Sequence, residues 1–181
     1  EKTCLRDEEV LAATGGLVKG ESSFLDWREQ SYPAWVTSAD IGDSCSLSTM
    51  VLHVEARRTL SRMFRELGQE EKAREWEEKS AALSAVIERF FRIPGHALYG
   101  QYLYGRGYPV LSEKVDSLGN LLCVLLGQAH GSHAAGMVAV LPHCVYGIPC
   151  FHPQMPDDVP PYHNRAMWPF LEGYYAQAAA A

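Results

Sequence analysis

Apolar residues recur at three- and four-residue steps through the middle of the chain, which is the spacing of one helix face. In the segment 43–67 these positions are Leu47, Met50, Val51, Val54, Leu60, Met63, Phe64 and Leu67. In the segment 69–92 they are Ala73, Trp76, Leu83, Ile87 and Phe90. Gly68 lies between the two segments and Pro94 follows the second, so each has a stop signal. Because the link is so short, we expect two antiparallel helices.

Further helices are expected on both sides of this hairpin. A short helix ends within 6–13, before a pair of glycines. The segment 117–127 is apolar nearly all round, which predicts a helix buried on several sides. A helix at 132–140 ends before Pro142, and a last one runs from Arg165 to the end of the chain.

Three stretches between these helices lack helical periodicity. The first, 17–42, is expected to be a structured loop with short strands. The second, 96–113, is a loop or short hairpin rich in Tyr and Gly, and the third, 142–163, is a long Pro-rich loop. Short links alternating with long loops predict a mainly all-α fold of antiparallel helical hairpins with long ornamented loops. We expect about half of a helix-hairpin toroid, with 1–181 as one partial catalytic domain.

The composition and charge of the chain argue against two classes of protein, nucleic-acid-binding proteins and membrane-spanning proteins. The chain has 181 residues, of which 47% are hydrophobic and 21% charged, as in ordinary globular proteins. Its 16 basic and 22 acidic residues give a net charge of −6, and no stripe of Lys and Arg is visible, so no nucleic-acid partner is expected. No apolar run is long enough for a membrane span. Because the chain starts at Glu1 without Met or signal peptide, the compartment stays open, with a periplasmic or secreted location favoured over a cytoplasmic one.

The five cysteines form no metal-binding or disulfide pattern. Their number is odd and no two are separated by two residues, so neither a zinc site nor a disulfide framework is expected. A pair between Cys144 and Cys150 stays an alternative to the favoured interpretation, which is buried free thiols.

The first candidate site lies in the loop that starts at Glu21. Asp26, Trp27, Arg28 and Glu29 pack acids, a base and an aromatic ring into a stretch without helical period. Cleavage of a glycosidic bond needs two carboxyl groups, so this cluster is a candidate site, although acids also gather in structural ion-pair corners. The alternative is a buried corner in which Arg28 pairs with Glu21 or Glu29.

Two more candidates lie at the starts of predicted helices. Tyr162, His163, Asn164 and Trp168 stand at the boundary between a loop and the last helix. The alternative there is that Asn164 is a helix N-cap and Trp168 a core residue. Asp116 precedes the apolar helix, where a helix cap is the simpler interpretation and a substrate contact the other.

Taken together, these segments resemble the six-hairpin glycosidases, the (α/α)6-toroid group that includes trehalase, glycogen-debranching amylo-glucosidase and processing α-glucosidase. The stretch from Glu21 to Asp26 is similar to a Glu-Ser-Gly-aromatic-Asp motif whose Asp is the general acid, which implies that role for Asp26. Here Ser23 replaces the glycine and the spacing is one residue longer. Glu29 and Glu21 therefore remain alternatives for the acid.

Two further stretches carry the resemblance over nearly the whole chain. Tyr162-His163-Asn164 followed by Trp168-Pro169 is similar to a Tyr-His-Asn-Gly…Trp-Pro signature, with Arg165 in place of the Gly. The stretch 115–119 looks like the opening of another inner helix of these enzymes. The residues expected to hold the substrate are Trp27, Arg28, Asp116, Tyr162, His163, Asn164 and Trp168.

The resemblance implies an inverting glycoside hydrolase that acts on α-linked glucosides or related oligosaccharides. It implies no metal or organic cofactor. The base that activates water would lie beyond this chain, in the remainder of the toroid from the same gene, since Glu172 is the only acid downstream of Trp168 and sits on the last helix. We therefore expect the isolated chain to have little or no activity.

Two other functions stay open. A sugar epimerase or lyase on the same helical toroid would use histidines as acid and base, and His143, His152 and His163 lie in the late loops. A non-catalytic carbohydrate-binding protein would use the aromatic rings without a working pair of carboxyl groups.

Overall fold

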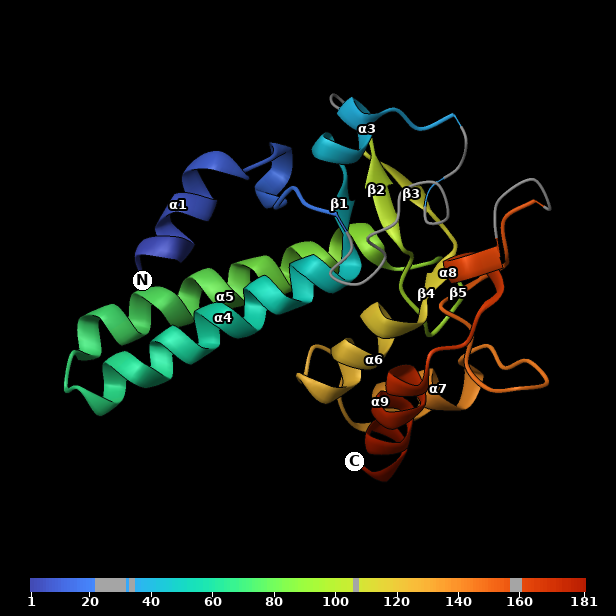
Figure 1. Ribbon diagram of the computed structural model, residues 1–181. Helices are drawn as coiled ribbons and strands as arrows, with labels where there is room; N and C mark the ends of the chain where they lie inside the picture. Colours follow the sequence, from blue (N-terminus) through green and yellow to red (C-terminus); the bar gives the residue numbers. More distant parts are fainter. Residues whose placement is uncertain (22–31, 33–34, 106–107, 157–160) are drawn as a thin grey trace.

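The computed structural model describes residues 1–21, 32, 35–105, 108–156 and 161–181. This part of the chain is mainly helical, with small antiparallel sheets (Figure 1). The helices are α1 Lys2–Val10, α3 Ser38–Asp43, α4 Leu47–Glu66, α5 Glu70–Phe91, α6 Ser117–Leu125, α7 Gly131–Val140, α8 Pro161–Arg165 and α9 Pro169–Ala180, and a 3₁₀ turn, η1, covers Thr14–Gly16.

The two long central helices form the expected hairpin, in which α4 and α5 lie side by side and extend away from the sheets (Figure 1). Gly68 adopts φ +69° at the end of α4. Its N–H donates to the carbonyl of Arg65 at 3.0 Å, and the N–H of Gln69 donates to that of Phe64 at 2.9 Å. These two bonds are a Schellman cap, which explains why α4 stops where the glycine predicts.

The predicted burial of the apolar faces of this hairpin is correct near the start of α4 and wrong at the tip of the hairpin. Leu47, Met50 and Val54 are buried as expected. Met63 and Leu67 are instead 56% and 67% exposed. They lie where the hairpin projects beyond the other described elements, so no second layer covers them (Figure 1).

Two helix starts differ from the sequence-based boundaries. The helix expected from residue 43 begins at Leu47, because the Ser46 side chain accepts a hydrogen bond from the Thr49 N–H and caps it. Residues 38–43 form α3, inside the stretch expected to be a loop. A capping box between Thr37 and Asp40 starts this helix.

The last helix also starts later than expected. Arg165 ends the short helix α8, and α9 begins at Pro169. A proline has no N–H to donate and pushes the preceding residue out of the helical region, so it favours the first position of a helix. Trp168 accordingly has φ −115° and ψ 123°, which are extended values.

The strands are short and lie at one end of the helices. β1 (Cys45–Ser46), β2 (Tyr102–Tyr104) and β3 (Val110–Ser112) form an antiparallel sheet in that order. The hairpin β2–β3 confirms the alternative of a short hairpin within 96–113. β4 (Val115–Asp116) pairs with β5 (Phe151–His152), which lies in the stretch expected to be a loop.

The helix α6 is buried, as its all-round apolar sequence predicts. Leu121 is 1% exposed and Cys123 is fully buried. α6 contacts α4, α7 and α9. All five cysteines are free thiols, but Cys144 is exposed rather than buried. None of the described helices is long and apolar enough to cross a bilayer.

Candidate functional site

An aromatic cluster forms where α8 leads into α9. Tyr162 lies edge-on to His163 and Trp168, with ring centroids 4.6 and 4.9 Å apart, and the centroids of His163 and Trp168 are 5.6 Å apart. His163 is 1% exposed, Trp168 is half-buried, and Tyr162 is 38% exposed. We call these three residues the aromatic cluster. Tyr162 is its exposed member and offers part of its ring to solvent.

Asn164 holds the loop in front of α8. Its side-chain oxygen accepts from the Met155 N–H at 2.7 Å, and its amide nitrogen donates to the Met155 carbonyl at 3.3 Å. Asn164 lies inside α8 rather than at the N-cap of the last helix, where Trp168 stands. These contacts give Asn164 a structural task, and its predicted contact with substrate stays a prediction.

Asp116 occupies the N-cap position of α6, as expected, but its side chain makes no capping hydrogen bond. The residue is 1% exposed, and its Oδ2 has no hydrogen-bond partner in the described part of the chain. Burial raises the pKa of this carboxyl to about 7, while the backbone amides of Gly119 and Leu118 oppose the shift. Asp116 can therefore carry or release a proton near neutral pH.

Gly119 allows the chain to pack tightly around this carboxyl. A Cβ added at Gly119 would lie 2.8 Å from Asp116 Oδ2 and 3.0 Å from Leu47 Cδ2. Real Cβ atoms essentially never lie within 3.0 Å of another atom, so the Asp116 carboxyl would have to move. The glycine thus lets α6 approach α4 with the carboxyl between them.

The two small strands β4 and β5 connect Asp116 to the aromatic cluster. Asp116 pairs with Phe151 in this antiparallel ladder. Two residues before Phe151, Pro149 forms an antiparallel bridge with Met167, the residue next to Trp168. Two segments about fifty residues apart in the sequence are thereby brought to the same edge of the fold.

On its other side, Asp116 lies near a pair of buried tyrosines. Tyr32 stacks on Tyr102 with ring centroids 4.9 Å apart and an angle of 24° between the planes. Burial raises the pKa of the Tyr102 hydroxyl well above its usual value, and Tyr32 and Asp116 raise it further. The Tyr102 hydroxyl therefore stays protonated and can donate a hydrogen bond.

The described residues on both sides of the first candidate segment are fixed in this region. Gly20 exchanges backbone hydrogen bonds with Ser44 and Ser46 at 2.9 and 3.2 Å. The Glu21 carbonyl accepts from Ser46 Oγ at 3.0 Å, and Ser46 lies opposite Tyr102 in the sheet. After the segment, Tyr32 stacks on that same Tyr102.

Four of the predicted residues, Asp26, Trp27, Arg28 and Glu29, lie outside the described residues. Their predicted roles stay predictions.

Two of the described candidate residues and the residue that caps α4 stand at the N-terminal ends of three helices. Ser46 caps α4, Asp116 precedes α6 and Trp168 precedes α9. Helix N-termini carry a partial positive charge and N–H groups without intrahelical partners, which favour hydrogen-bond acceptors and anions.

Sequence reasoning missed one polar residue near this region. Gln101 is fully buried, and neither its Nε2 nor its Oε1 has a hydrogen-bond partner in the described part of the chain. Its backbone carbonyl accepts from the Leu47 N–H at 3.0 Å, which places it beside the start of α4. A single Gln in a Gly- and Tyr-rich stretch gives no pattern from which to predict this.

The histidines expected in an epimerase occupy different environments. His143 Nδ1 lies 2.8 Å from the Leu141 carbonyl, and its ring contacts Tyr175. His152 is exposed on β5, whereas His163 is buried in the aromatic cluster. Across the described ranges, no group of three or more His, Cys, Asp or Glu side chains is arranged to hold a metal ion.

Comparison with known proteins identifies no relative: no protein-family model matches the chain, and no curated protein sequence matches it.

Proposed function

We propose that this protein is a glycoside hydrolase that acts with inversion on α-linked glucosides or related oligosaccharides. Its helical hairpins would be part of an (α/α)6 toroid. The observation that carries the proposal is the position of the aromatic cluster, which β4 and β5 join to the buried Asp116 at the N-terminal ends of α4, α6 and α9.

The aromatic cluster suits a sugar ring. A pyranose has an apolar face of C–H groups, and the exposed ring of Tyr162 offers a flat surface against which it can pack. The right-angle contact with Trp168 fixes the orientation of this ring. A preformed surface of this kind loses little entropy when it binds a ligand.

Asp116 suits a sugar hydroxyl. An oxygen that is buried without a partner costs stability unless a ligand or water satisfies it. With a pKa near 7, the carboxyl can either accept a hydrogen bond from a hydroxyl or donate one to it. We assign it to substrate binding.

The reaction itself would use Asp26 as general acid, with Glu29 as the alternative. The acid protonates the leaving oxygen while a base activates water on the opposite face of the sugar. Glu172 does not suit the role of base, because its Oε1 accepts from the Ile148 N–H at 2.6 Å and holds a loop.

The proposal is tested by changing the aromatic cluster in the full-length gene product. Tyr162→Ala and Trp168→Ala should each weaken substrate binding about 2- to 12-fold, since an aromatic contact contributes roughly 0.5–1.5 kcal/mol. Tyr146→Ala is the matched control, because Tyr146 is 83% exposed and outside the cluster. KM and kcat/KM for maltose and trehalose would be measured. Equal values for all three variants and the wild type would count against the site.

A further inference from the structure

The sheet β1–β2–β3 has a second face, turned away from the candidate site. Directly opposite residues share a face, and consecutive residues alternate. Ser46 lies opposite Tyr102, so both face the side where Tyr102 meets Tyr32. Cys45 lies opposite Leu103, and these two side chains face the other side.

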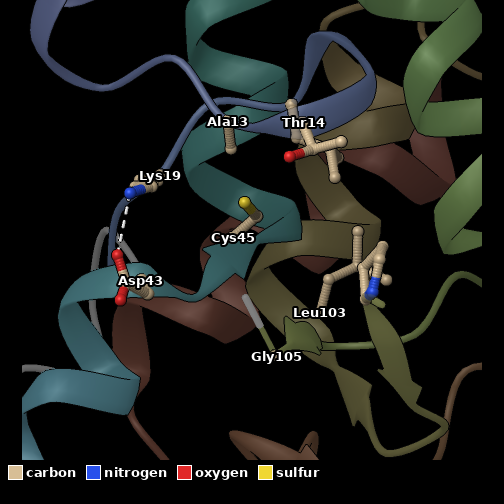
Figure 2. A pocket seen from close by; sticks show the side chains of 9 residues that line it. Ala13, Thr14, Lys19, Asp43, Cys45, Leu103 and Gly105 are labelled. Atoms are coloured by element: carbon tan, nitrogen blue, oxygen red, sulfur yellow. Dashed lines mark hydrogen bonds and ion pairs between the residues drawn. The ribbon is translucent and has the colours of Figure 1, made fainter. Parts of the chain in front are cut away.

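A pocket of about 170 Å³ lies on that other side. Figure 2 shows the Cys45 sulfur pointing into it, with Thr14 on one side and the Lys19–Asp43 ion pair on the other. The two charged groups are 2.8 Å apart. Apolar side chains complete the lining, from Ala13, Leu17, Leu103 and Pro109.

The size of the pocket fits one ring-sized molecule. An engineered cavity of roughly 150 Å³ is known to hold benzene. The pocket is similar in volume, so it can take a single six-membered ring but not an oligosaccharide.

The charges and polar groups favour a neutral ligand. Lys19 and Asp43 compensate each other, so the pocket carries no net charge from this pair. Burial raises the pKa of the Cys45 thiol to about 11, with Lys19 opposing the shift and Asp43 adding to it, so the thiol stays protonated. The walls nevertheless offer hydrogen bonds, since the Lys19 ammonium has three N–H donors and Thr14 has a hydroxyl.

We propose that this pocket binds one neutral monosaccharide unit, at a second site distinct from the aromatic cluster. The apolar side chains would contact the C–H face of the ring, and Lys19 and Thr14 would hydrogen-bond its hydroxyl groups. The choice of a sugar among neutral polyhydroxy compounds rests on the proposed function. Cys45 and Leu103 line this pocket on the face of the sheet opposite to Ser46 and Tyr102.

Cys45 gives a local readout of occupancy. The full-length protein would be treated with methyl methanethiosulfonate, a small uncharged thiol reagent, and the modification of each cysteine followed by peptide mass spectrometry. Glucose at about ten times its Kd should slow the labelling of Cys45 about tenfold. Labelling of Cys123, which is buried outside the pocket, should not change.

Variants separate the pocket from the rest of the molecule. Ala13→Leu fills the pocket and should abolish the protection by glucose, whereas Ala12→Leu, at an exposed neighbouring residue, should keep it. Thr14→Val removes a hydroxyl without filling the space and should raise the Kd for glucose about 2- to 12-fold. It serves as the second variant if Ala13→Leu does not fold.

Three results would overturn the proposal. Glucose could fail to protect Cys45, it could protect Cys123 equally, or only benzene or butyrate could protect, which would indicate an apolar or an anion-binding pocket. Protection that survives Trp168→Ala supports a separate site. Protection without any hydrolysis of glycosides would leave this pocket standing and refute the proposed enzyme, and hydrolysis without protection would do the reverse.

Discussion

At the scale of single residues, Asp116 combines a position at a helix start with a buried carboxyl. An aspartate at a helix start usually accepts hydrogen bonds from the first turn and stays ionised. Here the carboxyl is buried, its Oδ2 has no partner in the described part of the chain, and the first-turn amides of Gly119 and Leu118 only partly offset the effect of burial on its pKa. Its sequence position predicts the N-cap, but the burial comes from β5 and α4, which are distant in sequence.

This burial predicts a pH dependence of stability. The folded-state pKa of about 7 lies above the ordinary value of 3.8, so between these values the folded protein keeps a proton that the unfolded chain has lost. The contribution of Asp116 to stability should be greatest below about pH 4, fall as the pH rises to about 7, and then stay constant, a difference on the order of 4 kcal/mol.

Asp116→Asn should remove this decline, because the amide does not ionise. The free energy of unfolding would be measured in urea from pH 4 to 8. Glu113→Gln, at a nearby exposed carboxyl, is the control. If the decline for Asp116→Asn matches that of the wild type, the carboxyl is not buried as described.

At the scale of elements, the starts and ends of helices could be predicted where residues close in sequence determine them. Gly68 marked the end of α4 because it adopts a left-handed conformation there. The capping box at Thr37 and Asp40 has a pattern that is visible in the sequence, and it starts α3 inside a stretch that was expected to be a loop. Pro169 likewise predicts that α9 begins at this residue rather than at Arg165.

Other features of the elements could not be predicted from residues close in sequence. The pairing of β4 with β5 joins two-residue strands that have no periodicity of their own. The exposure of Met63 depends on which elements reach the tip of the hairpin. Both are decided by tertiary contacts.

The packing of α6 on α4 predicts opposite effects of one substitution at two glycines. Gly119→Ala should destabilise the protein by about 1–3 kcal/mol, since its Cβ would clash with Asp116 and Leu47. Gly173→Ala in α9 should stabilise it by about 0.5–1 kcal/mol, because nothing lies within 4 Å of the added Cβ. Thermal unfolding of both variants is the measurement. A neutral effect at Gly119 would show that α6 and α4 are farther apart than described.

The two hydrogen bonds between the Asn164 side chain and the Met155 backbone predict a loss of stability on mutation that a residue contacting only substrate would not show. Asn164→Ala leaves the buried N–H and carbonyl of Met155 without these partners, which should cost about 1–3 kcal/mol. Tyr162→Ala, at the exposed residue two positions earlier, should cost less. Urea unfolding of the two variants decides this. If Asn164→Ala leaves the urea midpoint of unfolding unchanged, Asn164 has no structural role and only its proposed contact with substrate remains.

At the scale of the whole molecule, the sequence suggested that separate segments lie together, and strand pairing brings two of them to the same edge of the fold. Asp116 and the aromatic cluster are connected through β4 and β5, and the residues flanking 22–31 lie beside Tyr102 and Ser46. Residues close in sequence do not predict which distant segments will pair. This arrangement was expected only because the segments resemble motifs of one family.

The central claim is that this molecule cleaves α-glucosides with Asp26 as the acid. The most direct test is kcat/KM of the full-length gene product on maltose and on α-glucosyl fluoride, with the product anomer followed by proton NMR. The wild type should release the β-anomer first. Asp26→Asn should lose about 10²- to 10⁴-fold on maltose and much less on the fluoride, whose leaving group needs little protonation. If Glu29→Gln shows this pattern instead, Glu29 is the acid. No release of sugar by the wild type, or release that neither Asp26→Asn nor Glu29→Gln affects, would contradict the account.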